Sequence, residues 1–263
     1  MLTRIVFALV IVLNLSSQAL AETASAAPIE EQRKILIQNG YERWEWMRSD
    51  CEDCEIYFLT AAPEMQSEKV QAFFYALIDK KPELQRLYKV SGQEYTLLAT
   101  MSIGILGRES KFWTSPRYIL KESAPWLVYL VKVVQAYLKG ESTVLPLSRG
   151  PTQIKYIPNK IVQVYGVTPD TLHVPENAAV ATMGFLIETL AELKRRIVIN
   201  RLDYINESNY VDYLPYLYFG SRRKLITGQA TPETNIYIRD MKRYMSLVEV
   251  YERRPEEGVR VLH

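Results

Sequence analysis

Histidine is nearly absent from this chain of 263 residues, which contains only His173 and His263. Ser-His-Asp and Cys-His catalysis both require a positioned imidazole base. His173 lies in the polar, proline-flanked stretch VTPDTLHVPEN, and no G-x-S-x-G motif occurs. No G-x-x-x-x-G-K-[ST] or G-x-G-x-x-G loop is present either, so nucleotide chemistry has no support. If the chain is an enzyme, we expect it to work with carboxylates.

Cysteine is equally scarce, with Cys51 and Cys54 in the stretch SDCEDC. In an exported chain such a C-x-x-C pair can be a local disulfide, a redox site or half of a zinc site. Zinc requires two further ligands, for which only the two histidines remain, and the βαβ pattern of a thioredoxin-type site is missing. A structural Cys51–Cys54 disulfide is therefore favoured, with a loop too short to stabilise the fold much. We predict no metal site and no cofactor.

The charge balance also excludes one class of partner. A formal net charge of +2 is too small to indicate nucleic-acid binding. The content of 48% hydrophobic and 24% charged residues is that of an ordinary globular protein. Eighteen tyrosines are present, and they suit either core and surface packing or a sugar-binding cleft, which uses aromatic faces with a polar tip.

Residues 1–21 have the pattern of a secretory signal peptide. Arg4 precedes the apolar stretch from Ile5 to Leu15, and small residues end the segment at Ala19-Leu20-Ala21. We predict cleavage after Ala21 and an exported, periplasmic or secreted protein; the alternative is a retained N-terminal anchor. No later segment offers about 18 uninterrupted apolar residues. No membrane span is therefore expected after cleavage.

Helical periods dominate the rest of the chain and strand signals are few, which predicts a mainly α fold. The last helix is expected to have Thr231 as its N-cap, Pro232 at its first position and an apolar stripe that extends to Tyr251. The other expected helices are an amphipathic segment at 30–48, one from Ser67 to about Lys81, a buried one at Tyr95–Gly107, and those at Pro125–Leu138 and Pro175–Arg196.

Glu109 stands out because it follows the buried helix in SIGILGRESKFW. The C-terminal end of a helix disfavours an anion, and Phe112 and Trp113 add desolvation. Both effects raise the pKa of a carboxyl group, which suits a general acid near neutral pH. The alternative is a structural salt bridge with Arg108 or a distant lysine.

Several segments occur in the order of one known superfamily. GRESKF is similar to the E-S-x-F signature of soluble lytic transglycosylases and goose-type lysozymes, and SRGPTQIKYIP to their S-x-G-L-M-Q-I-x-P segment. PENAAVATMGFLIETLAEL resembles the helix that follows, and YLYFGS and TPETNIYIRDMKRY resemble the A-Y-N-x-G and P-E-T-x-x-Y-V elements. Over residues 95–251 the chain therefore resembles the lysozyme-like superfamily.

The resemblance implies a domain order and a set of site residues. It implies a signal peptide at 1–21, an N-terminal helical extension at 22–94, a lysozyme-like catalytic domain at 95–254 and a loose tail at 255–263. Glu109 matches the acid that protonates the glycosidic oxygen between muramic acid and glucosamine. Tyr237 matches the tyrosine that hydrogen-bonds this acid, although it also fits the apolar stripe of the last helix. Ser148, Gln153 and Tyr218 match residues of the sugar-binding cleft, with turn capping, a solvated side chain and core packing as their alternatives.

Three departures from the pattern concern substrate recognition. Pro151-Thr152 replace the Leu-Met whose methionine lies near a sugar N-acetyl group, and Phe219 replaces the asparagine of A-Y-N. An inserted segment at 117–140 is expected to add a helix beside the cleft. Thr152 was therefore assigned to substrate binding, with a preference for partly deacetylated peptidoglycan. Such a preference resembles that of lysozymes from predatory bacteria that act on deacetylated walls.

The resemblance leaves the reaction open. A hydrolase needs water, often placed by a second carboxylate, and Glu122, Glu141 and Asp170 are candidates. A lytic transglycosylase would instead release anhydro-muropeptides. A third hypothesis is a non-catalytic wall-binding or interaction module. Peptidoglycan glycan strands are the expected partner in each case.

Overall fold

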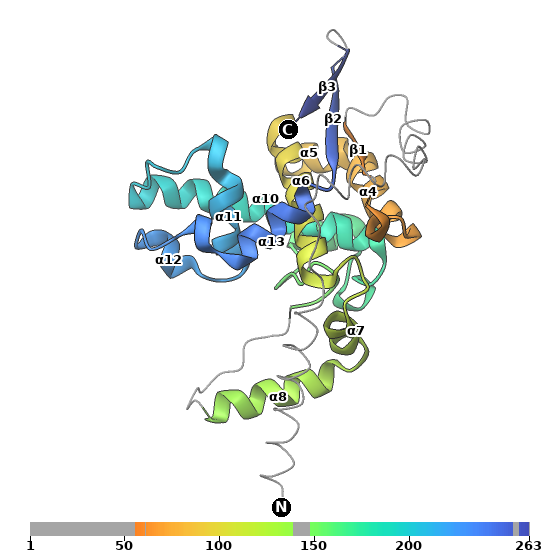
Figure 1. The fold of residues 1–263 in the computed structure, drawn as a ribbon, viewed down its shortest axis with the longest axis vertical. Coiled ribbons are helices and arrows are strands. Elements are labelled where there is room, and N and C mark those ends of the chain that lie inside the picture. The colour runs from red at the N-terminus through yellow and green to blue at the C-terminus, as the bar shows by residue number, and fades with distance from the viewer. Residues whose placement is uncertain (1–55, 61, 139–147, 255–257, 263) are drawn as a thin grey trace, which may run out of the picture. The chain divides into compact units, whose positions relative to one another are not determined.

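The computed structural model describes residues 56–60, 62–138, 148–254 and 258–262, and the structural statements below concern these residues (Figure 1). The fold is mainly α, as the sequence predicts. In chain order the elements are β1 (Ile56–Leu59), η2 (Pro63–Met65), α4 (Glu68–Asp79), α5 (Lys81–Tyr88), α6 (Gly92–Ser110), α7 (Pro116–Ser123), α8 (Pro125–Leu138), α9 (Asn159–Tyr165), η3 (Pro169–Thr171), α10 (Pro175–Asn200), η4 (Glu207–Asn209), α11 (Tyr210–Tyr218), α12 (Arg222–Ile226), η5 (Pro232–Thr234), α13 (Ile236–Met245), β2 (Glu249–Arg254) and β3 (Gly258–Leu262).

Some of the sequence predictions fall outside the described residues. These are the signal peptide at 1–21, the amphipathic segment at 30–48 and the Cys51–Cys54 disulfide. Within the described ranges, no helix is both long and apolar enough to cross a membrane. Residues 62–94, from the expected N-terminal extension, form η2, α4 and α5, and α4 packs along α10.

Helices α6 and α10 form the centre of the described fold, with α13 lying along α6 (Figure 1). Helix α6 begins with a capping box, in which Ser91 Oγ accepts from the Glu94 amide and the Glu94 carboxylate accepts from the Ser91 amide. From Tyr95 to Gly107 nearly every side chain is buried, so other parts of the protein pack around the whole circumference of the helix. Its burial determines where its C-terminal residue, Ser110, and the preceding Glu109 are placed.

Two glycines let α6 and α13 approach closely. A Cβ atom on Gly104 would lie 2.5 Å from Met245 Cγ, and one on Gly107 would lie 2.4 Å from Tyr244 Cγ. Real Cβ atoms are not found at such distances. The pair at i and i+3 therefore makes the shallow groove into which the side chains of α13 pack, and it sets the spacing between the two helices.

The final helix differs from its prediction at both ends. Thr231 makes no side-chain capping bond, and Pro232–Thr234 form the short 3-10 turn η5. Asn235 is the N-cap of α13 instead, because its side chain accepts from the amides of Tyr237 and Ile238. The helix ends at Met245, so the expected continuation of its stripe through Tyr251 is wrong: Tyr251 lies in β2.

The tail after Pro255 also differs from expectation. Residues Gly258–Leu262 form β3, which pairs antiparallel with β2, and β2 pairs in turn with β1. The described part of the tail is therefore held by backbone hydrogen bonds rather than loose. Alternating apolar residues in GVRVL, which suit a strand, are the sequence signal for this pairing.

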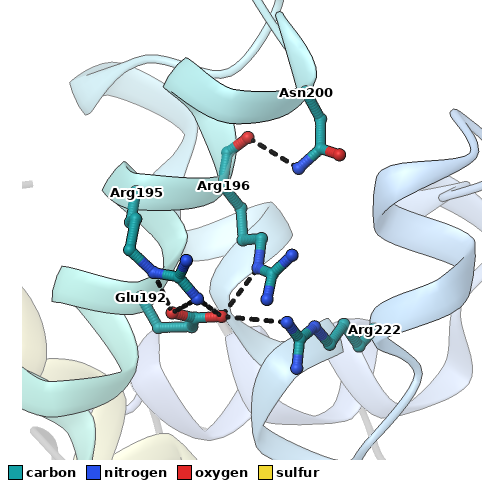
Figure 2. A network of polar contacts seen from close by, with 5 residues as sticks. All are labelled: Glu192, Arg195, Arg196, Asn200 and Arg222. Atoms are coloured by element: carbon teal, nitrogen blue, oxygen red, sulfur yellow. Dashed lines mark hydrogen bonds and ion pairs between the residues drawn. The ribbon is translucent and has the colours of Figure 1, made fainter.

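A carboxylate with several arginine partners joins α10 to α12 (Figure 2). The Glu192 oxygens accept from Arg195 Nε at 2.7 Å and Arg196 Nε at 2.7 Å, and Arg222 Nη2 on α12 lies 3.4 Å away. Partial burial alone would raise the pKa of Glu192, but the hydrogen bonds from Arg196 and Arg195 hold it below its ordinary value. This network ties the short α12 to the long central helix.

The inserted segment forms two helices rather than one. Pro116 and Pro125 stand at the first positions of α7 and α8, where the missing amide of proline costs nothing. Helix α8 keeps large apolar side chains in solvent, with Trp126 68% and Tyr137 83% exposed. Helix α7 buries Tyr118 and directs other side chains toward the site described below.

We expect Gly107→Ala to lower the free energy of unfolding by about 1–3 kcal/mol, because the new methyl group meets Tyr244 and Phe112. The higher helix propensity of alanine, worth about 1 kcal/mol, does not offset this clash. Urea unfolding measures the loss, and near-ultraviolet circular dichroism reports the disturbed aromatic packing.

Gly166→Ala is the control for this variant. Gly166 has φ +64 and no atoms near its added Cβ, so it should lose about 1 kcal/mol by backbone strain and keep its aromatic spectrum. A Gly107→Ala variant as stable as the parent would contradict the close packing of α6 and α13.

Candidate active site

Glu109 lies in the last turn of α6, directly before an unusual backbone turn. Lys111, Phe112 and Trp113 all have left-handed conformations, with φ of 47°, 55° and 67°. Bulky residues adopt this region at a cost of about 1–2 kcal/mol each. Such strain persists only where surrounding contacts impose it, and it is concentrated at functional sites.

The contacts that hold this turn come from one hydroxyl and two rings. Ser110 Oγ donates to the Leu106 carbonyl at 2.9 Å and accepts from the Trp113 amide at 3.1 Å. Phe112 packs edge-on against Tyr244, and Trp113 against Phe73, so both rings are buried. Ser110 therefore holds the turn that directly follows Glu109.

The carboxyl group of Glu109 is mostly buried and has no ion-pair partner among the described residues. Its flanking Arg108 pairs with Asp240 on α13 instead, with Nε 3.3 Å from Oδ2. Burial raises the pKa of Glu109 above its ordinary value. Tyr237 and the charges of Arg108, Lys121 and Arg117 oppose this shift without cancelling it. Within the part of the chain that the structure describes, Glu109 does not form the structural salt bridge that the sequence left open.

Tyr237 enters the site from the first turn of α13, where the Asn235 cap accepts from its amide at 2.9 Å. Its ring is packed between the Arg108 guanidinium, 5.3 Å from the ring centroid, and the ring of Phe219, 5.1 Å away. The hydroxyl lies close enough to Glu109 to lower the pKa of the acid. Within the described structure it has no hydrogen-bond partner of ordinary geometry.

Burial, and next the charge of Glu109, raise the pKa of Tyr237 well above its ordinary value. The phenol therefore keeps its proton and can donate a hydrogen bond to the Glu109 carboxylate. Phe219 occupies the position at which the resemblance implies asparagine. In the structure it supports the ring of Tyr237.

A second group of polar side chains, the Gln153 cluster, comprises Lys121, Glu122, Ser148 and Gln153. Lys121 Nζ donates to Ser148 Oγ at 2.9 Å and also to Gln153 Oε1. Gln153 Nε2 donates to Glu122 Oε1 at 3.2 Å and to the Gly150 carbonyl at 2.6 Å. The structure thus brings Ser148 and Gln153 together and adds two residues of α7.

The loop that presents Gln153 is a tight one. The amide of Arg149 donates to the Ile154 carbonyl at 2.9 Å, which closes the loop with an isolated β-bridge. Gly150 (φ +72) and Gln153 (φ 56) both adopt left-handed conformations within it. The Gln153 side chain then folds back on its own loop through Gly150, which leaves its amide oriented toward α7.

Lys121 links the Gln153 cluster to the acid. Burial, and then the charge of Lys132, lower the pKa of Lys121 to about 8, while Glu122 and Glu109 oppose the shift. Its positive charge in turn lowers the pKa of Glu109. The sequence does not predict Lys121 as a site residue, because no local pattern indicates its contacts with Ser148 and Gln153.

Thr152 and Tyr218 do not face a ligand in the structure. Thr152 is 1% exposed, and its hydroxyl lies 2.6 Å from Thr182 Oγ1, which itself donates to the Ala178 carbonyl. Tyr218 is 3% exposed and donates its hydroxyl proton to the Thr152 carbonyl. The assignment of Thr152 to a sugar contact is therefore not supported, and Tyr218 fixes the loop from behind.

An aromatic cleft of about 650 Å³ adjoins the Gln153 cluster, although Glu109 does not line it. Arg149, Ile154, Lys155 and Tyr156 form one wall, and they belong to the same loop as Gln153 and the residues that follow it. The remaining lining residues are Pro125, Trp126, Tyr129, Ile157, Pro169 and Leu172. One wall of the cleft therefore belongs to the same loop as Gln153, whereas Glu109 lies at the end of α6 and outside the cleft.

The described residues contain no group of three or more histidine, cysteine, aspartate or glutamate side chains that could hold a metal ion. A search of protein-family models, of curated proteins and of solved structures finds no match to this chain.

We expect Glu109→Gln to be more stable than the parent at neutral pH. Because the folded-state pKa of Glu109 is raised, its contribution to stability is present below the unfolded pKa and is lost as pH rises through the folded pKa. Glutamine stays neutral, so the Tm difference between variant and parent should grow as the pH is raised from 4 to 8. A difference that is constant with pH would contradict a desolvated, unpaired acid.

Proposed function

We propose that the chain is a peptidoglycan glycosidase of lysozyme type, which cleaves the β-1,4 bond between N-acetylmuramic acid and glucosamine. One observation carries the proposal: a carboxyl group at the end of a buried helix, beside a buried tyrosine hydroxyl, that has no ion-pair partner among the described residues and whose pKa is raised by burial. The order of the motifs around Glu109, Ser148, Gln153 and Tyr237 supports the same fold family. Export through the segment at 1–21 would bring the protein to the wall.

Glu109 would act as the general acid. Burial keeps the carboxyl protonated to a higher pH than usual, so it can donate to the glycosidic oxygen as the bond breaks. The resulting carboxylate is stabilised by a hydrogen bond from Tyr237 and by the positive charges of Lys121 and Arg117. These groups stabilise the anion only once the proton has left, which favours the transition state over the ground state.

Glu122 is our choice for the second carboxylate of a hydrolase. Of the three acids that the sequence leaves open, it alone has a described contact to the site, through Gln153 Nε2 at 3.2 Å. Asp170 is exposed on η3, and Glu141 lies outside the described residues. A carboxylate held on Gln153 can orient water toward the anomeric carbon, as inverting glycosidases require.

Two alternatives remain as outcomes of the tests. A lytic transglycosylase would use Glu109 alone and close an anhydro ring with the muramyl hydroxyl. A wall-binding module would bind strands without cutting them. The preference for deacetylated strands expected from Thr152 is not proposed further, because that hydroxyl is bonded to Thr182 and the cations near the loop disfavour a cationic sugar.

We expect Glu109→Gln to lose about 10²–10⁴-fold in cleavage of purified peptidoglycan, since it keeps the shape of the side chain and removes the proton donor. Zymography and release of soluble muropeptides measure this. Undiminished digestion by the folded variant would exclude Glu109. A parent protein that binds wall without clearing it would indicate the binding module.

We expect Tyr237→Phe to lower turnover about tenfold or more without loss of thermal stability, because the deleted hydroxyl has no ordinary partner in the described structure. The alkaline limb of its pH–rate profile should move to higher pH, since Tyr237 lowers the pKa of Glu109. Tyr244→Phe, on the same helix, is the control and should keep the parent profile. Parental turnover in Tyr237→Phe would remove it from the site.

We expect Glu122→Gln to slow the release of reducing ends and raise the share of anhydro products, because water loses its base. Mass spectrometry of the muropeptides reports both species, with Asp170→Asn as the matched control. Parental rate and products in Glu122→Gln would contradict the assignment. Anhydro products from the parent itself would make the chain a lytic transglycosylase.

A further inference from the structure

The aromatic cleft combines exposed rings with cationic side chains. Trp126 and Tyr129 on α8 are 68% and 48% exposed, and Tyr156 on the opposite wall is 52% exposed. Arg149 and Lys155 line the same cleft. Exposed aromatic faces stack on the apolar faces of sugar rings, and arginine and lysine bind carboxylates.

The cations around the cleft lack acidic partners in the described structure. Arg149 and Lys155 have no carboxylate within 4.0 Å there, and the same holds for Lys121 and Arg117 on the neighbouring α7, whereas arginines of α10 and α12 are paired with Glu192. Burial lowers the pKa of Lys155, as expected for an ammonium group without a counter-ion.

Two of the acids near the cleft already accept hydrogen bonds. Glu122 accepts from Gln153, and Glu188 accepts from the Tyr156 hydroxyl at 3.1 Å. The cleft therefore has room for an anion on its cationic side and for sugar rings on its aromatic side. An acidic peptide attached to an amino-sugar chain has both features.

We propose that this cleft binds peptidoglycan through the carboxylates of its stem peptides, which Arg149 and Lys155 contact while a sugar ring lies against Trp126, Tyr129 or Tyr156. This inference rests on the proposed function and adds a substrate class to it: peptide-bearing, acidic strands in preference to strands stripped of peptides. The walls of the cleft come from the inserted helix α8 and from the loop that carries Gln153. Helix α8 thus has a recognition role in a cleft that is separate from the acid.

The test uses the full-length Glu109→Gln protein, so that strands are bound without being cut. The probes are soluble peptide-bearing glycan strands and the same strands after amidase treatment, and isothermal titration calorimetry gives Kd. We expect peptide-bearing strands to bind about tenfold more tightly than stripped ones, with a difference that shrinks as salt is added.

Arg149→Gln and Lys155→Gln, each added to Glu109→Gln, should weaken binding of peptide-bearing strands about two- to fivefold and leave stripped strands unaffected. Lys69→Gln on α4 removes an equally exposed lysine elsewhere and should change neither Kd. Deacetylated strands, which carry extra positive charge, should bind less tightly than acetylated ones.

Equal affinity for peptide-bearing and stripped strands, or unchanged affinity in both cleft variants, would overturn the inference. The result is separable from the proposed function, because binding is measured without cleavage. Selective binding by a parent that cuts no wall would support the cleft and reject the glycosidase. Wall cleavage by a parent that binds both kinds of strand equally would support the glycosidase and reject the proposed role of the cleft.

Discussion

The close contact between α6 and α13 determines the geometry of the whole candidate site. Gly104 and Gly107 remove the side chains that would hold the helices apart, so the backbone of one lies against Met241, Tyr244 and Met245 of the other. Tyr237 is carried on the same helix as those contacts, and Glu109 follows Gly107 by two residues. A change in helix spacing would therefore alter the distance between the acid and its phenol before it altered anything else.

This helix packing also determines which charged groups surround Glu109. A carboxyl group that is desolvated by burial favours its neutral form, and the nearby cations are engaged by other partners. Arg108 pairs with Asp240, and Lys121 donates to Ser148 and Gln153. The charges of Arg108 and Lys121 lower the pKa of Glu109 without offsetting the effect of burial, so its pKa remains above the ordinary value.

Sequence reasoning succeeded where the determinants are local. An apolar stretch from Tyr95 to Gly107 has no exposed face, so it predicts a buried helix, and α6 confirms this prediction. The position of Glu109 after that stretch indicates a raised pKa, while its assignment as a catalytic acid depends on the motif resemblance. The start of α13 was wrong because Thr231-Pro232-Glu233 fits a helix cap, yet the side chain of Asn235 competes successfully for the first amides. Tyr251 continues a helical spacing by coincidence, since strand pairing with β1 and β3 decides its conformation.

The other wrong or missing predictions concern contacts between residues that are far apart in the sequence. Nothing in the neighbourhood of Lys121 indicates that it meets Ser148 and Gln153, because that contact depends on how α7 turns after the left-handed residues at 111–113. Thr152 was assigned by position within a motif, but the hydroxyl of Thr182 on α10 determines where it points. A motif match gives the order of residues along the chain, but it does not tell whether a side chain is buried or exposed.

The components of the candidate site come from widely separated parts of the chain: the end of α6, the inserted α7, the loop at 148–154 and the start of α13. Bringing them together requires closure of long loops, which is slow and is complete only when the final helix has docked on α6. A nascent or unfolded precursor would carry Glu109 in water, with an ordinary acidity and no phenol beside it. If the proposed function is correct, the acid and its phenol would come together only after the C-terminal region has folded.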